Sequence, residues 1–165
     1  MNHQKGFTLI EMLIVVALIL IIAAITIPSM IDAKIHTDEA SAVASIRAIN
    51  QAEVAYFGSY GGFAGSLANL GGAEPCTRSA ETACLLDESL AGGVKSGYNF
   101  AAIGANPANE GNTTYVVGAA PVAFNRTGKR MFCSTEKNVM RADLNNQGST
   151  TPPNAQQCAG FGALK

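Results

Sequence analysis

One carboxylate, Glu11, stands inside a long apolar run near the start of the chain. Residues 7–27 are apolar apart from this acid and two threonines. A helix of that length is about 31 Å long, enough to cross the roughly 30 Å hydrocarbon core of a bilayer. A carboxylate inside such a span costs on the order of several kcal/mol unless it is neutralised. We therefore interpret Glu11 as a functional residue that needs a positively charged partner.

The junction before the apolar run indicates where that partner could arise. A secretory signal is cut after its apolar core, whereas here the small residue Gly6 precedes the core and follows the basic Lys5. Cleavage after Gly6 would remove a polar leader, keep the apolar helix and create an amine on Phe7. Two opposite charges 4 Å apart attract by about 1 kcal/mol in water and about 4 kcal/mol at an effective dielectric of 20.

The segment 6–17, GFTLIEMLIVVA, together with Pro28, resembles the N-terminal signature of type IV pilins and of the related type II secretion pseudopilins. The resemblance implies that a prepilin peptidase cuts between Gly6 and Phe7 and methylates the new amine of Phe7. It also implies that Glu11 faces the terminal amine of a neighbouring subunit during assembly. The alternative within one subunit is a contact between Glu11 and its own Phe7 amine, or a protonated Glu11.

A helical pattern continues after the span, so Pro28 is either a kink within one long helix or the end of the span. Apolar residues recur with helical spacing, which favours the kink and predicts one helix over residues 7–56. This stripe comprises Ile31, Ile35, Ala42, Ile46 and Ile49, with Val43, Val54 and Phe57 beside it. The charged residues are assigned mostly to the other faces: Lys34, Asp38, Glu39, Arg47 and Glu53.

Glycines from Gly58 onward predict that the helix ends near residue 56. The aromatic residues Tyr56, Phe57, Tyr60 and Phe63 surround this point. They could form a binding patch, but we favour apolar anchoring of the glycine-rich loop over the helix. A short helical turn is possible over residues 66–70.

The second half of the chain has the pattern of short strands separated by polar turns. Strands are expected at 98–103, 113–118 with 121–124 nearby, 130–134 and 138–142, and turns at 106–112, 125–128 and 136–138. Consecutive strands with short turns favour an antiparallel meander with one face against the helix. The predicted fold class is α+β, with an irregular surface tail over residues 144–165.

Four cysteines, Cys76, Cys84, Cys133 and Cys158, permit three pairings. Outside the cytoplasmic membrane an even number in a small domain indicates disulfides. We expect Cys76 to pair with Cys84 and Cys133 with Cys158, each closing the nearer loop, and the second pair resembles the C-terminal disulfide loop of type IV pilins. A zinc site is the alternative, but the spacings are wide and no histidine lies nearby.

No catalytic pattern stands out. Beyond the leader the one histidine, His36, lies on the helix and is interpreted as a solvated residue, and no nucleophile elbow or phosphate-binding loop is evident. The net charge of -1 does not indicate a specific nucleic-acid partner. Arg126, Lys129 and Arg130 form only a small basic cluster, interpreted as a solvated turn. We expect no enzyme activity, no cofactor and no metal.

These observations predict a leader at 1–6, a helix at 7–56 whose 7–27 half crosses the membrane and drives assembly, and a head at 57–165. The N-terminus would be cytoplasmic in a bacterial inner-membrane precursor, with the head in the periplasm. The expected partners are copies of the same chain, prepilin peptidase, and pilus or secretion assembly machinery. The favoured function is the subunit of a type IV pilus-like filament. A type II secretion pseudopilin and a monomeric membrane-tethered binding module are the alternatives.

Overall fold

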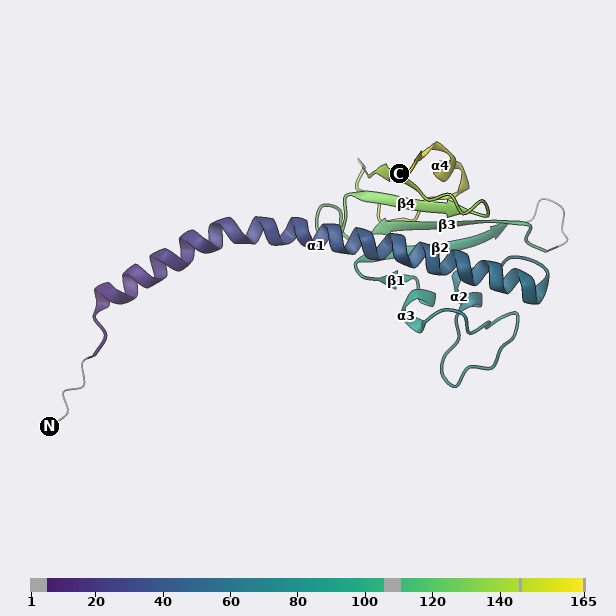
Figure 1. Cartoon of the computed structure of the whole chain (residues 1–165), viewed down its shortest axis with the longest axis horizontal. Coiled ribbons are helices and arrows are strands. Elements are labelled where there is room, and N and C mark those ends of the chain that lie inside the picture. The colour runs from purple at the N-terminus through teal and green to yellow at the C-terminus, as the bar shows by residue number, and fades with distance from the viewer. Residues whose placement is uncertain (1–5, 106–110, 146, 165) are drawn as a thin grey trace. The chain divides into compact units, whose positions relative to one another are not determined.

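The computed structural model describes residues 6–105, 111–145 and 147–164 (Figure 1). The leader residues 1–5 and most of the predicted turn at 106–112 lie outside this range. The chain forms two compact units, Met1–Lys34 and Ile35–Lys165. One helix, α1 (Leu9–Tyr60), contributes to both.

The long helix exists as expected, but both of its ends differ from the predicted range of 7–56. It begins at Leu9 because Thr8 serves as its cap. Gly58, predicted to lie beyond the helix, is within it, and the helix stops at Tyr60 because Gly61 has a φ of 77°. A left-handed residue of this kind is a common helix ending, and glycine adopts it without steric cost. The backbone stays helical through position 28, so the helix does not end at Pro28; a kink there stays a prediction.

The second half of α1 buries one stripe. Ile35, Ala42, Ile46 and Ile49 are almost fully buried, as the spacing predicts, and Ala52 and Tyr56 extend the stripe. Three residues expected on or beside it are instead exposed to about half of their area: Ile31, Val54 and Phe57. The buried face is therefore narrower than the sequence pattern suggested.

The head contains a six-stranded antiparallel sheet in which the strands neighbour one another in chain order. Its strands are β1 (Val94–Lys95), β2 (Tyr98–Ala105), β3 (Thr114–Pro121), β4 (Arg130–Thr135), β5 (Arg141–Leu144) and β6 (Gly162–Ala163). The predicted meander and α+β class are confirmed. The turn between β1 and β2 uses Ser96 and Gly97, both with positive φ, which is the backbone that matches a tight hairpin.

Two expectations for the end of the chain need correction. The strand predicted at 138–142 begins only at Arg141, because Asn138 has a φ of 56° and belongs to the turn. The tail predicted to be irregular contains α4 (Ala155–Gly160) and β6, which pairs with β5. Asn154 caps α4 through a reciprocal bond pair with Gln157, so local sequence chemistry does specify this element.

The core of the head lies between the buried stripe of α1 and one face of the sheet. Figure 1 shows this part of α1 running along the sheet. Two short helices, α2 (Leu67–Leu70) and α3 (Glu88–Ala91), close one side of it, and α2 matches the predicted turn at 66–70. The largest fully buried hydrophobic side chains are Tyr98, Phe132, Ile46, Ile49, Leu70, Leu90 and Val117.

Both disulfides join the pairs expected from the spacing. Cys133 on β4 is bonded to Cys158 on α4, and both residues are completely buried. Cys76 is bonded to Cys84 across a partly exposed loop that follows α2. The Cys133–Cys158 bridge therefore fixes α4 to the sheet, whereas the Cys76–Cys84 bridge shapes a surface loop.

Replacing Cys133 and Cys158 together by alanine should lower the free energy of unfolding by about 3–4 kcal/mol, because that bridge spans 25 residues. Urea unfolding of the full chain in detergent micelles, followed by far-UV circular dichroism, would measure the loss. The matched control is the Cys76→Ala, Cys84→Ala pair, whose bridge spans 8 residues and should contribute less, about 2–3 kcal/mol. A larger fall in the free energy of unfolding for the Cys76→Ala, Cys84→Ala pair would contradict the prediction that the Cys133–Cys158 bridge stabilises the fold more.

Candidate functional site

The predicted cleavage junction lies in non-helical, exposed backbone. Residues 6–8 precede α1, and the Phe7 side chain is 74% exposed. The space around Gly6 is open, since a side chain added there would meet no atom within 4 Å. A peptidase must read an extended segment, so the local structure leaves the bond between Gly6 and Phe7 accessible to one.

Thr8 and Glu11 form a reciprocal hydrogen-bond pair at the start of α1. The backbone N–H and the hydroxyl of Thr8 donate to Glu11 Oε2 at 3.1 and 2.9 Å, and the Glu11 N–H donates to Thr8 Oγ1 at 3.3 Å. This is a capping box, which satisfies N–H groups that a helix otherwise leaves unpaired. Sequence analysis did not identify Thr8 as part of the site, although the spacing Thr-x-x-Glu was a visible signal. Both bonds to the carboxylate use Oε2, which leaves Oε1 for another donor.

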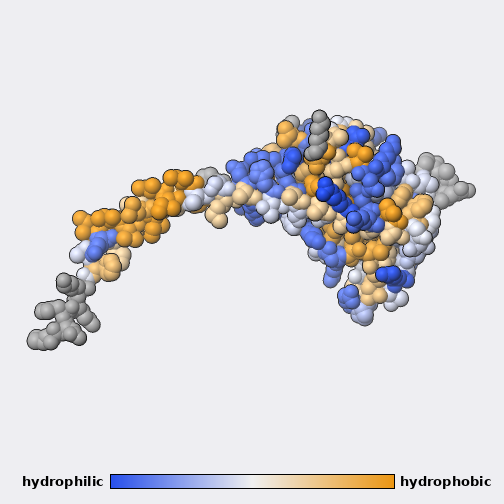
Figure 2. All heavy atoms as spheres, viewed as in Figure 1, coloured by the Kyte–Doolittle hydropathy of each residue, from blue (hydrophilic) through white to orange (hydrophobic). Residues whose placement is uncertain are grey.

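The helical surface that follows is apolar and exposed. Large aliphatic side chains from Leu9 to Ile27 are between about half and four fifths exposed, and Figure 2 shows this hydrophobic surface on the first part of α1. Within the described residues, α1 is the one helix long and apolar enough to cross a membrane. An aliphatic surface of this extent is unfavourable in water at about 25 cal/mol per Å², so lipid or other protein has to cover it.

Two acids on the buried stripe of α1 were assigned wrongly to its solvated faces. Glu39 and Glu53 are 3% and 0% exposed. The signal was present in the spacing: the step of seven between Ile35 and Ala42 passes over position 39, and Glu53 continues the four-three alternation after Ile49. An acid in such a position is retained only where the tertiary structure supplies donors.

Glu39 is held by strand β4. The backbone N–H groups of Lys129 and Arg130 donate to its Oε1 at 2.9 and 3.2 Å, and the Arg130 guanidinium lies 2.7–2.8 Å from its Oε2. The guanidinium also lies over the ring of Phe132, 5.3 Å from the centroid. Arg130, predicted to belong to a solvated basic turn, is thus part of a paired ion cluster that joins α1 to the sheet. Because Glu39 is buried while the Arg130 side chain is 40% exposed, losing Arg130 would leave a buried carboxylate held only by backbone donors and open to water on one side.

Glu53 has a less complete set of partners. Its Oε2 accepts from the Ala64 N–H at 2.9 Å, and its buried Oε1 has no hydrogen-bond partner among the described residues. Burial raises the pKa of Glu53 from 4.5 to about 7, against the opposing effect of the Ala64 bond. Nearby, Asn50 donates to Ser134 Oγ at 2.9 Å and accepts from the Tyr115 hydroxyl at 3.1 Å. These polar contacts fix the helix against β3 and β4.

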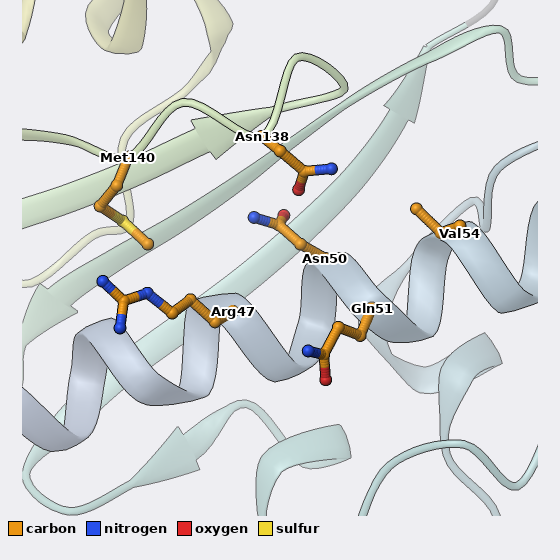
Figure 3. A pocket seen from close by; sticks show the side chains of 6 residues that line it. All are labelled: Arg47, Asn50, Gln51, Val54, Asn138 and Met140. Atoms are coloured by element: carbon orange, nitrogen blue, oxygen red, sulfur yellow. The ribbon is translucent and has the colours of Figure 1, made fainter.

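One open cleft of about 520 Å³ lies along the same helix. Figure 3 shows Asn50 and Arg47 of α1 directed toward the segment that carries Asn138 and Met140, with Asn50 and Asn138 facing each other. Gln51 and Val54 complete the lining. These six side chains include one cation and three amides but no nucleophile or acid, so the cleft has no arrangement that indicates catalysis.

The remaining candidates have ordinary surroundings. His36 is exposed on α1, as expected. The four cysteines are consumed by disulfides, which is incompatible with the zinc alternative. Within the described ranges, no three His, Cys, Asp or Glu side chains cluster as metal ligands would.

Comparison with known proteins defines the N-terminal segment. Residues 1–27 match the family described as the prokaryotic N-terminal methylation motif. Two fimbrial proteins of Pseudomonas aeruginosa are 50% identical to the chain over 52 residues, which cover 32% of this chain and 34% of each relative. The type IV major pilin protein PilA of Myxococcus xanthus is 40% identical over 55 residues, covering 33% of this chain and 25% of that protein. No solved structure matches the chain.

The chain carries the N-methyl prepilin motif, and the resemblance drawn from residues 6–17 is confirmed. Its fold is α+β and pilin-like, with a long helix that begins at the motif and contributes to a sheet-containing head. The chain spans about a third or less of the length of the curated relatives that it matches.

The burial of Glu53 predicts a specific dependence of stability on pH. The pKa of Glu53 is about 7 in the folded state, above its ordinary value of 4.5, so protonated Glu53 favours folding. This contribution to the free energy of unfolding is complete below pH 4.5 and is lost as the pH rises through about 7. The free energy of unfolding should fall by up to about 3 kcal/mol over this window relative to Glu53→Gln, which stays neutral.

Chemical unfolding of the full chain in micelles at several pH values would measure this slope. Glu88→Gln, which alters an exposed acid on α3, is the control and should retain the wild-type slope. An unchanged slope in Glu53→Gln would contradict the prediction.

Proposed function

We propose that the protein is the structural subunit of a type IV pilus-like filament. The observation that carries the proposal is the first half of α1: an exposed apolar helix that begins beside a methylation motif and has one carboxylate in its first turn. The role is structural rather than enzymatic. Covering this surface with identical helices from other subunits, related by a repeat that does not close, gives an open helical filament.

Before assembly the same surface suits a bilayer. The precursor is a single-pass inner-membrane protein, with the leader in the cytoplasm and the head in the periplasm. Support comes from the length and hydropathy of α1 and from the basic Lys5 that precedes it. The leader comprises residues 1–6, the mature chain begins at Phe7 just before α1, and Pro28 is the site of a kink within that helix.

Prepilin peptidase then cuts between Gly6 and Phe7 and methylates the Phe7 amine. Support comes from the motif itself and from the exposed, non-helical backbone of residues 6–8. The mature chain would begin with a positively charged aromatic residue, just before the Thr8 cap. The pilus assembly machinery inserts this mature subunit into the growing filament.

Glu11 provides the electrostatic contact between subunits. Its Oε2 serves the Thr8 cap, and its Oε1 accepts from the Phe7 amine of an adjacent subunit. In partly dehydrated surroundings this attraction is worth about 4 kcal/mol at 4 Å, against about 1 kcal/mol in water. The pairing therefore favours subunits in register over subunits that remain separate in the membrane.

Two alternatives share part of this physics. A type II secretion pseudopilin would use the same N-terminal motif, but the relatives described above are named as fimbrial and major pilin proteins, which favours the pilus. A monomeric tethered binding module would use Glu11 only in the Thr8 cap and would leave its Oε1 without a charged partner in the membrane.

Mass spectrometry of the protein purified from its native membranes or filaments should give a mature chain that begins at Phe7 and carries one added methyl group. Gly6→Leu should block this processing and leave the leader attached. Because the space around Gly6 is open, the variant should fold normally, and an unchanged circular dichroism spectrum is the control. A mature protein that retains residues 1–6 would refute the proposal.

Glu11→Ala should yield a processed, membrane-resident protein that is excluded from filaments, as measured by electron microscopy and by the amount of subunit in sheared filaments. Loss of the subunit contact should reduce incorporation by at least about tenfold, since each 1.4 kcal/mol is tenfold in an equilibrium constant.

Thr8→Val separates the contact between subunits from the helix cap. It removes the hydroxyl of the capping box but keeps the Glu11 carboxylate, so filaments should still form, whereas Thr8→Ser should behave as the wild type. If Thr8→Val loses filaments as completely as Glu11→Ala, then Glu11 acts through the cap and the proposed amine contact is wrong.

A further inference from the structure

A second cleft, of about 500 Å³, lies where α1 ends and the glycine-rich loop begins. Its lining comes from the end of α1 with the loop after it, from α2, from the disulfide loop and from the residues just before β3. It includes Tyr56, Tyr60, Phe63, Asn69, Glu81 and Asn112. We call this the aromatic cleft.

One wall of the aromatic cleft is built from rings that pack on one another at tilted angles. The ring centroids of Tyr56 and Tyr60 are 4.6 Å apart, and Phe63 packs in turn on Tyr115 at 4.6 Å. Tyr56 is buried and its hydroxyl donates to the Ala80 carbonyl at 2.8 Å, whereas Tyr60 is 39% exposed. The inner tyrosine is therefore fixed by the loop, and the outer ring is offered to the cleft. Loop anchoring, favoured from sequence, describes Tyr56 and Phe63 but not Tyr60.

The opposite wall is preformed by the disulfide loop. The Cys76–Cys84 bond closes this loop, and the Ala83 and Cys84 N–H groups donate to the carbonyls of Asn69 and Gly71 at 2.8 and 2.9 Å. Ala80 and Glu81 are thereby held beside the tyrosines. A site whose walls are already in place loses little entropy when a ligand enters.

The electrostatic character of the aromatic cleft is negative. Among its lining residues Glu81 is the one carboxylate, and none is a lysine, arginine or histidine. A hydrogen bond from the Ser79 side chain lowers the pKa of Glu81, so this acid is ionised at neutral pH. The last turn of α1 contains no basic residue, so the partial negative charge of the helix C-terminus is not offset there.

The charge is felt at the aromatic wall. Burial raises the pKa of the Tyr56 hydroxyl, and the nearby charges of Glu81 and Glu53 act in the same direction. A negative aromatic face combined with a carboxylate is the arrangement that attracts cations with apolar substituents. A simple metal ion is less suitable, because such ions require several oxygen ligands around them.

We propose that the aromatic cleft binds an organic ammonium group. The ring of Tyr60 contacts its methyl or methylene groups, and the negative Glu81 carboxylate attracts its positive charge. Both a lysine side chain of another protein and a choline headgroup carry this chemistry. The assignment does not depend on filament formation, because every residue that it uses belongs to the unit Ile35–Lys165. Failure of the filament proposal would leave it intact, and the reverse is also true.

The test is ligand-detected saturation-transfer NMR on the full chain in a polyoxyethylene-ether detergent, which contains neither ammonium nor sugar groups. Choline and Nα-acetyl-lysine amide, which keeps its side-chain ammonium group, are the two charged probes. The neutral isostere of choline is 3,3-dimethylbutan-1-ol. Both charged probes should bind, and the isostere should bind at least about fivefold more weakly. Preference for one charged probe identifies the source of the ammonium group.

Glu81→Gln and Tyr60→Leu should each weaken binding of the charged probes by about fivefold or more, while the chain keeps its circular dichroism spectrum. Glu88→Gln changes an exposed acid elsewhere on the head and should bind as the wild type. Methyl glucoside tests whether the rings instead serve a sugar. Three results would overturn the proposal. The neutral isostere could bind as tightly as choline, methyl glucoside could bind better than both charged probes, or neither charged probe could bind.

Discussion

The constraint on which the structure depends is the uncovered aliphatic surface of the first half of α1. Among the residues that the structure describes, the large aliphatic side chains from Leu9 to Ile27 are left exposed, and the helix places a carboxylate at their start. The exposed apolar surface is unfavourable in water, and the carboxylate becomes unfavourable once lipid or protein covers it without supplying a partner. Both are accommodated if the surface is covered first by lipid and then by identical helices whose terminal amines meet the acid. Thr8 contributes by capping the helix through one oxygen of Glu11 while leaving the other available.

The second half of the same helix, in contrast, buries its apolar side chains within the head. There the stripe from Ile35 to Tyr56 is buried against the sheet, and the two acids on it are satisfied inside the head. Glu39 is paired with strand β4 through backbone and guanidinium donors, so it contributes orientation as well as attraction. Glu53 has one donor and responds to burial by holding its proton. One helix thus leaves an acid exposed near its start, where we propose the contact between subunits, and encloses two other acids within the head.

One of the two disulfides stabilises the core of the head, and the other stabilises a surface loop. Cys133–Cys158 is buried and fastens α4 to β4, and the following β6 pairs with β5 at the edge of the sheet, so the polar tail has a defined course. Cys76–Cys84 is partly exposed and fixes a loop against the end of α1, where it encloses the aromatic cleft. A small head with modest apolar content gains order from such bonds without a larger core. The surface loop is therefore rigid enough to act as a wall of a binding site.

Local chemistry determined several features from sequence alone: the cleavage motif, the apolar span, the long helix, the order of the strands and the pairing of the cysteines. Each depends on residues close together in the chain or on a regular period. The surroundings of Glu39, Glu53 and Tyr60 depended on the tertiary structure; both acids were predicted on the solvated faces of the helix, although their spacing fits the buried stripe. The Arg130 partner of Glu39 is 91 residues away, and the wall opposite Tyr60 comes from the disulfide loop. Whether a charged side chain is solvated or enclosed depends on donors that only the folded head brings to it, and sequence periodicity does not reveal those donors.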